Sequence, residues 1–157
     1  MLTKYLFVFF LSMVPLIELR GAIPFALGMD LPVIPAIIVC VIGNMLPVPF
    51  IYMFARKFLL WGTKQRYIGK FCNFFVVKGE EAGRKLTAKA GRWGSFLGLM
   101  LFVGIPLPGT GAWTGTLAAS FLDVGPKTTA LSVSLGVILA GIIMSVVSAL
   151  GLHIFGL

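Results

Sequence analysis

The third of four apolar segments is interrupted at its centre by the stretch Gly104-Ile105-Pro106-Leu107-Pro108-Gly109-Thr110-Gly111. Eleven residues of apolar character precede it, 93–103, and eleven follow it, 112–122. Proline removes a backbone donor and glycine adds backbone freedom, so this stretch cannot continue a helix. The sequence therefore predicts two short helices joined by irregular backbone.

The composition places these segments in a membrane. Of the 157 residues, 59% are apolar and 11% are charged, roughly half the charged share of a soluble domain. No charged residue occurs in 31–55, 93–122 or 128–157, and each run exceeds the roughly 20 residues that cross a bilayer. We therefore expect a multi-pass protein of the cell membrane and exclude a disordered chain.

The break at 104–111 would lie near the middle of that membrane. Eleven helical residues extend about 16 Å, half the thickness of the hydrocarbon layer. Free backbone amides and carbonyls are tolerated at that depth only where they line a protein-enclosed or hydrated cavity. The break is therefore a candidate binding site.

The positive charge is concentrated in one linker. Ten of the thirteen lysines and arginines lie in residues 56–92, which the positive-inside rule places in the cytoplasm. Apolar residues recur there at helical spacing and predict an amphipathic helix on the inner membrane surface; they are Ile68, Phe71, Cys72 and Phe75. A second short helix is expected over 80–92. The linker either anchors topology or binds anionic lipid headgroups, and we expect no nucleic-acid partner.

The two halves of the chain have a similar order of segments. Each contains a broken apolar segment, 5–29 or 93–122, then an acid with a nearby proline, then a long uncharged run, 31–55 or 128–157. Joined by a cytoplasmic linker, these units predict an all-α membrane domain with an inverted repeat of helical hairpin plus transmembrane helix. The broken segments either cross the membrane or are re-entrant hairpins. Hairpins are favoured, because two breaks that face each other would explain the irregular backbone in both.

Glu18 and Arg20 are the only ionisable residues inside an otherwise apolar membrane segment. A charge at that depth is costly and marks a functional candidate. Glu18 could bind and release a proton, while Arg20 would either keep Glu18 charged or bind an anionic group of a substrate. The alternative is a structural ion pair or a shallow interfacial tip.

The second break would add neutral groups to the same site. Amides at the start of a half-helix suit an anion, and Trp113 offers a cation–π face or an interfacial anchor. Asn44, beside Pro47 and Pro49, either lines the cavity or bonds another helix. The candidate substrate or ion site comprises Glu18, Arg20, Gly21, Pro24, Asn44, Pro106, Pro108, Gly109, Thr110, Gly111, Trp113 and Thr114.

Other features indicate packing rather than chemistry. Asp30 and Asp123 are expected to cap helices. Small residues four apart in the last run, such as Ser132, Gly136 and Ala140, indicate close packing within the chain or a dimer seam. Because a monomer of this size encloses little volume, we expect a homodimer. No nucleophile–base pair, paired carboxylates, phosphate loop or metal-ligand cluster is visible in the sequence, so we expect no enzyme, cofactor or metal.

Three motifs together resemble the small multidrug export proteins of bacteria and archaea. They are Pro15-Leu16-Ile17-Glu18-Leu19-Arg20-Gly21-Ala22-Ile23-Pro24, Gly43-Asn44 with Pro47-Val48-Pro49, and Ile105-Pro106-Leu107-Pro108-Gly109-Thr110-Gly111-Ala112-Trp113-Thr114-Gly115. That family is similar to the DedA superfamily (SNARE-associated, or VTT), whose members are pictured with two opposed re-entrant hairpins.

The resemblance implies a small membrane transporter or lipid flippase. Better-understood DedA proteins move polyprenyl phosphate lipids, and acids and arginines in their hairpins suggest proton coupling. Glu18 and Arg20 match these in kind, but the second hairpin here has no charged residue, where DedA proteins typically carry arginine. The implied substrate is amphipathic, such as a polyprenyl-phosphate lipid or a drug-like cation. The alternative is a non-transporting membrane protein that organises lipid or assists assembly.

Overall fold

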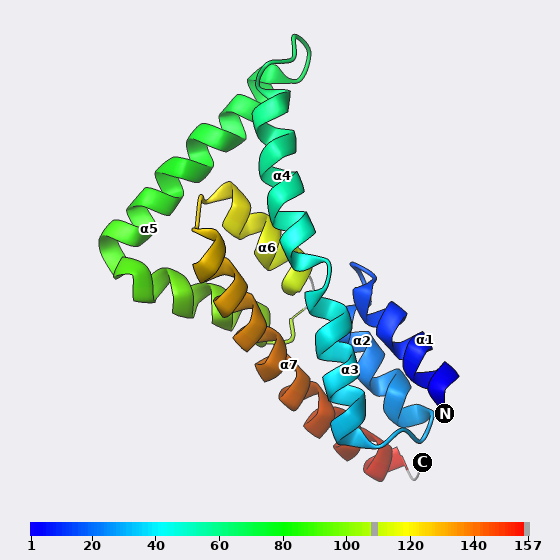
Figure 1. Ribbon diagram of the computed structural model, residues 1–157. Coiled ribbons are helices and arrows are strands. Elements are labelled where there is room, and N and C mark those ends of the chain that lie inside the picture. Colours follow the sequence, from blue (N-terminus) through cyan, green and yellow to red (C-terminus); the bar gives the residue numbers. More distant parts are fainter. Residues whose placement is uncertain (108–109, 156–157) are drawn as a thin grey trace.

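The computed structural model describes the backbone of residues 1–107 and 110–155, with side chains apart from those of 59, 75, 78–90, 92 and 152–155. The described part is helical and contains no strand, which confirms the all-α class (Figure 1). Its helices are α1 (Leu2–Met13), α2 (Glu18–Gly28), α3 (Val33–Met45), α4 (Val48–Gly62), α5 (Gly69–Gly104), α6 (Ala112–Phe121) and α7 (Pro126–Phe155).

Two helical stretches are long and apolar enough to cross a membrane. One is Val33–Gly62, with 30 residues, and the other is Pro126–Gly151, with 26. The first comprises α3 and α4, which meet at a turn at Leu46-Pro47. The sequence predicts that the span ends at Ala55, where the uncharged run ends. The helix continues seven residues further, so the first basic residues, Arg56 and Lys57, lie within α4.

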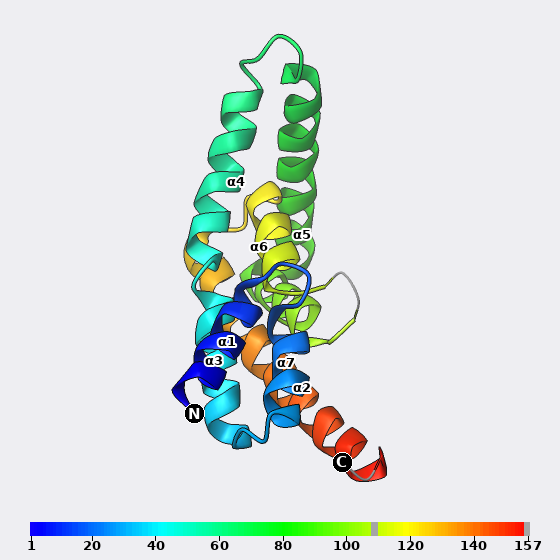
Figure 2. The same ribbon diagram turned by 90° about the vertical axis from the view of Figure 1, so that its right-hand side faces the viewer.

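α1 and α2 form a helical hairpin. The chain turns at residues 14–17 and α2 runs back beside α1, so that both open ends lie at the same end of the molecule (Figures 1 and 2). The sequence predicts the interruption of this segment at 17–24, so the turn falls at its start, and Gly21 and Pro24 both lie inside α2. The cause is Pro15: the residue before a proline avoids helical geometry, and Val14 is extended, with φ −71° and ψ 128°.

The second hairpin consists of the end of α5 and all of α6. α5 changes direction sharply at Gly91 (Figure 1), whose φ of 67° is in the left-handed region that glycine tolerates. Residues 92–104 then form the first arm, a loop follows, and α6 is the second arm. In the expected amphipathic helix Cys72 is buried and Phe71 is exposed, while the Phe75 side chain lies outside the described set. Residues 80–90 are helical, but the separate short helix expected over 80–92 is not formed, because this stretch continues α5 as far as the change of direction at Gly91.

The second arm of each hairpin ends in the same way. Asp30 after α2 and Asp123 after α6 have φ of 60° and 53°. The next residue in each case donates back across the turn, Leu31 N–H to the Ala26 carbonyl at 3.1 Å and Val124 N–H to the Ala119 carbonyl at 2.9 Å. This is the Schellman pattern of helix termination. Both aspartates therefore cap helices, at carboxyl ends.

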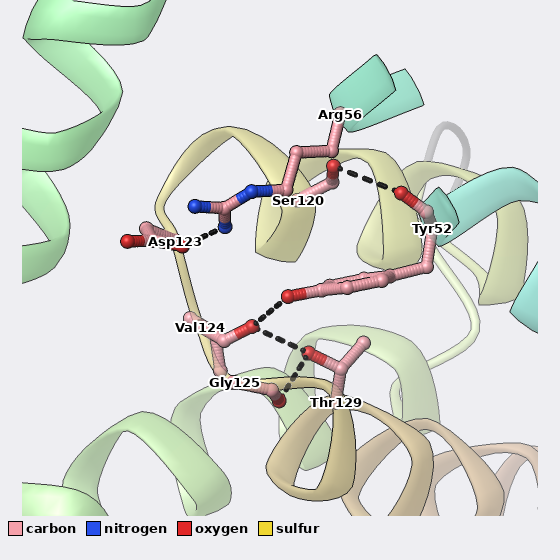
Figure 3. Close-up of polar contacts among 7 residues, drawn as sticks. All are labelled: Tyr52, Arg56, Ser120, Asp123, Val124, Gly125 and Thr129. Carbon is pink, nitrogen blue, oxygen red and sulfur yellow. Dashed lines mark hydrogen bonds and ion pairs between the residues drawn. The ribbon is translucent and has the colours of Figure 1, made fainter. Parts of the chain in front are cut away.

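A polar cluster ties α4 to the junction between α6 and α7 (Figure 3). Arg56 forms an ion pair with Asp123. The Tyr52 hydroxyl donates to the Val124 carbonyl at 2.6 Å, and the Thr129 hydroxyl donates to the Gly125 carbonyl at 3.1 Å. The first transmembrane-length stretch is thereby fixed to the end of the second hairpin.

α5 and α7 pack closely along the small residues of α7. Ser132, Gly136 and Ala140 are all buried. A Cβ placed on Gly136 would lie 2.7 Å from the carbonyl oxygen of Met100 and 2.8 Å from Cβ of Val103. These residues therefore pack within the chain rather than at an open seam.

Replacing Gly136 with alanine should destabilise the protein, because the added methyl overlaps backbone that cannot move easily. Overpacking of this kind costs about 1–3 kcal/mol. The matched control is Gly98→Ala in α5, where an added Cβ meets no atom within 4 Å; the better helix propensity of alanine should make it neutral or stabilising. Thermal unfolding of both variants in detergent measures the difference, and equal melting temperatures would contradict the close packing.

Candidate functional site

The tips of the two hairpins meet, and hydrogen bonds run between them in both directions. The turn before α2 faces the loop between α5 and α6. Glu18 and Arg20 project from the first tip, and Trp113 projects from the second. The partners on the opposite side are mostly backbone groups, as expected where irregular chain is buried.

Glu18 contacts the start of α6. The residue is only 6% exposed, and its Oε1 accepts a hydrogen bond from the Trp113 backbone N–H at 3.1 Å. A Cβ on Gly111 would collide with the carboxylate, so the absence of a side chain there allows the approach. The first amides of a helix lack internal partners and carry partial positive charge. A carboxylate suits this position.

Arg20 contacts the end of α5 and the loop beyond it. Its guanidinium donates to the carbonyls of Val103 and Ile105, both at 3.2 Å, and to the carbonyl of Leu107. It also donates to the Thr110 hydroxyl at 2.9 Å. Carbonyls at the end of a helix carry partial negative charge, and the fork of guanidinium donors satisfies several at once.

Trp113 contributes a side-chain hydrogen bond from the second hairpin tip to the first. Its indole N–H donates to the Met13 carbonyl at 3.1 Å, at the last residue of α1. Glu18 and Arg20 form no ion pair with each other in the described part of the chain. The two side chains therefore do not meet as a direct ion pair, because each charge is placed at the helix end of opposite polarity.

A cavity of about 350 Å³ lies beside these contacts. Five of the predicted site residues line it: Glu18, Arg20, Pro106, Thr110 and Thr114. Gly111 and Trp113 adjoin it through their contacts with Glu18, whereas Pro108 and Gly109 lie outside the described residues. The sequence missed Leu107 and Met144, because no charge or periodicity marks an apolar residue that packing brings to the tips.

Three other predicted residues lie away from the cavity. Gly21 packs against Ile17 of its own turn, and Pro24 is exposed inside α2. Asn44 is buried at the end of α3. The error for Gly21 and Pro24 follows from the earlier turn at Pro15, which moves both residues from the expected break onto a helix.

A second hollow, of about 590 Å³, lies on the other side of α6. Its walls are apolar and come from α4, α6 and the start of α5, with its lining formed by Ile51, Phe54, Ala55, Phe58, Ile68, Phe71, Cys72, Trp113, Leu117 and Phe121. Trp113 lines this groove and the next residue, Thr114, lines the tip cavity. The first turn of α6 therefore separates a hollow that contains polar and charged side chains from a wholly apolar one.

Comparison with known proteins identifies one family. A family model described as "Putative small multi-drug export protein" matches residues 18–143, a range that begins directly after the turn of the first hairpin and includes the second hairpin and all the candidate site residues. No curated relative and no solved structure matches the chain significantly.

The Glu18 carboxylate should be needed for its acceptor oxygen as well as its charge. Glu18→Ala leaves the half-buried Trp113 amide without this partner and should lower the free energy of unfolding by about 1–3 kcal/mol. Glu18→Gln keeps an oxygen that can accept this bond, so it should cost less. Thermal unfolding of the two purified variants tests the contact, and a Gln variant as unstable as the Ala variant would contradict it.

Proposed function

We propose, since the chain belongs to the small multi-drug export family, that it is a compact transporter whose two hairpin tips form the gate of the transport path. The family and the two membrane-length apolar helices make it a membrane protein of an export class. The position of the gate, its coupling and its substrate are our proposal. Both hairpins would be re-entrant, with tips meeting inside the bilayer.

One observation carries this proposal: both charged side chains of the first hairpin tip, Glu18 and Arg20, form hydrogen bonds with backbone groups at helix ends of the second hairpin. The tips are thus held together by hydrogen bonds, and a ligand with suitable polar groups can replace these bonds. An anionic group would compete with the α5 carbonyls for Arg20. Protonation of Glu18 would remove its attraction to the start of α6. Either event loosens one side of the gate, which makes proton coupling the favoured mechanism.

The two hollows beside α6 support an amphipathic substrate. A polar part fits the tip cavity, which offers Arg20, Thr110 and Thr114, and an apolar part fits the aromatic groove beyond Trp113. Both a polyprenyl-phosphate lipid and a drug-like cation have this character, the first paired with Arg20 and the second with Glu18 and the Trp113 ring. Movement of such a lipid would make the protein a DedA-like flippase.

The arrangement of the halves supports an inverted repeat. Each contains a hairpin whose second arm ends at a left-handed aspartate, followed by a helix of membrane length. In this topology residues 63–68 and the start of α5 face the cytoplasm, where their basic side chains meet anionic lipid headgroups. We further propose a homodimer, because so small a chain encloses little path by itself.

A second candidate function is a non-transporting protein that organises lipid or assists membrane assembly. One observation favours it: Glu18 and Arg20 already have backbone partners, so the tips also fit a permanent clamp. The two functions differ in whether flux depends on Glu18.

Flux measurements in proteoliposomes test the proposal. The probes are a fluorescent cationic dye and a fluorescent polyprenyl phosphate, each with and without a proton gradient. Glu18→Gln should reduce flux of the transported probe by at least about tenfold, equivalent to about 1.4 kcal/mol in barrier height, while the protein stays folded. Arg56→Lys, which changes the exposed ion pair with Asp123, serves as the matched control and should retain flux. Unchanged flux in Glu18→Gln would exclude the assigned role.

Reactivity of single cysteines distinguishes a gate from a sealed clamp. In a background with Cys40 and Cys72, both buried, replaced by alanine, cysteines at Leu107, Thr110 and Thr114 should react with water-soluble thiol reagents, since these positions line the cavity. Cysteines at the buried Val103 and Ala112 should not. Uniform protection of all five positions would favour the structural alternative.

A further inference from the structure

The junction between α3 and α4 leaves backbone oxygens without helical partners. α3 ends at Met45 and α4 begins at Val48. Pro47 and Pro49 carry no N–H, so the carbonyls of Gly43 and Met45, four residues earlier, have no helical donor. The junction lies within the apolar stretch Val33–Gly62, where lipid offers no replacement donor.

The Asn44 side chain adds an acceptor at the same place. Asn44 is 2% exposed, and its Oδ1 has no hydrogen-bond partner in the structure. Buried polar atoms are nearly always paired, and an unpaired one marks a position for a water or an ion. Asn44 contributes nothing to the hairpin contact, so the gate does not explain this atom.

Ser12 brings a further oxygen from α1. A Cβ on Gly43 would collide with Ser12 Oγ and lie 2.6 Å from the Phe9 carbonyl oxygen, so the two helices are in close contact next to Asn44. The Ser12 hydroxyl donates to the Phe9 carbonyl at 2.7 Å. With its proton committed there, the oxygen faces its surroundings as an acceptor.

We infer that the α3–α4 junction binds a monovalent metal cation, with Asn44 Oδ1 as a ligand, supported by Ser12 Oγ and the freed carbonyls of Gly43 and Met45. Neutral oxygens suit Na⁺ better than Ca²⁺ or Mg²⁺, which rely on carboxylates. The described residues contain no cluster of three acidic, histidine or cysteine side chains. Interrupted membrane helices use unwound carbonyls and half-helix carboxyl ends for Na⁺ in the same way.

The position of this site links it to the hairpin tips. Ser12 contacts the junction, and the next residue, Met13, accepts the Trp113 indole bond. A cation at Asn44 would therefore stabilise the end of α1 that Trp113 contacts. The inference goes beyond the proposed function and does not depend on it, since cation binding is measurable whether or not the protein transports anything.

The full chain, purified in detergent, tests the inference through its melting temperature in NaCl, KCl and choline chloride at equal ionic strength. A ligand that binds the folded state raises the melting temperature in a saturable way. We expect such a rise with Na⁺ relative to choline, and its loss in Asn44→Ala. Ser132→Ala, in α7, removes the other buried side-chain oxygen that lacks a partner among the described residues, and should retain the Na⁺ effect. Identical melting in all three salts would overturn the inference and indicate water at Asn44.

Asn44→Asp decides the question if Asn44→Ala does not fold. The aspartate has nearly the same shape and adds a negative charge, so it should lower the Na⁺ concentration at half-saturation by at least about tenfold. An unchanged half-saturation, or a Na⁺ effect that persists in Asn44→Ala, would overturn the assignment. Loss of flux in Glu18→Gln with intact Na⁺ stabilisation would show that the two proposals stand apart.

Discussion

The rest of the structure depends on one constraint: backbone polar groups buried among apolar segments must find partners inside the protein. The interruption after α5 exposes carbonyls at one helix end and amides at the start of the next. Arg20 supplies donors for the carbonyls, and Glu18 supplies an acceptor for an amide. Glu18 and Arg20 therefore lie where backbone groups of the opposite hairpin lack partners. The need to satisfy these groups determines how the two hairpins meet.

The sequence was informative where chemistry is local. Uncharged runs predicted the membrane-length helices, and the proline–glycine interruption predicted a loop before Gly111, because these signals act within a few residues. The first turn lies at the very start of the interruption expected at 17–24, because Pro15 keeps Val14 out of helical geometry and so ends α1. The charges of Glu18 and Arg20 indicated which residues lie at the tip, but they did not indicate where the chain turns.

The hydrogen bonds between the hairpin tips were harder to predict, because most of their partners are backbone groups and every residue has the same backbone groups. No sequence pattern indicates that the Met13 carbonyl receives the Trp113 indole, or that the Leu107 carbonyl receives Arg20. Glu18 and Arg20 were assigned a joint site on the correct grounds that buried charges need partners. Their partners proved to be peptide groups of distant segments, and spacing along the chain carries no information about these.

The contact between the tips is complementary rather than symmetrical. One tip presents a carboxylate and a guanidinium, while the described part of the other presents peptide groups, a hydroxyl and an indole. Two tips of the second kind would leave the helix-end dipoles without charged partners. Exchanging the two tips would therefore not preserve the contact, because the charges and the helix ends that bind them belong to different hairpins.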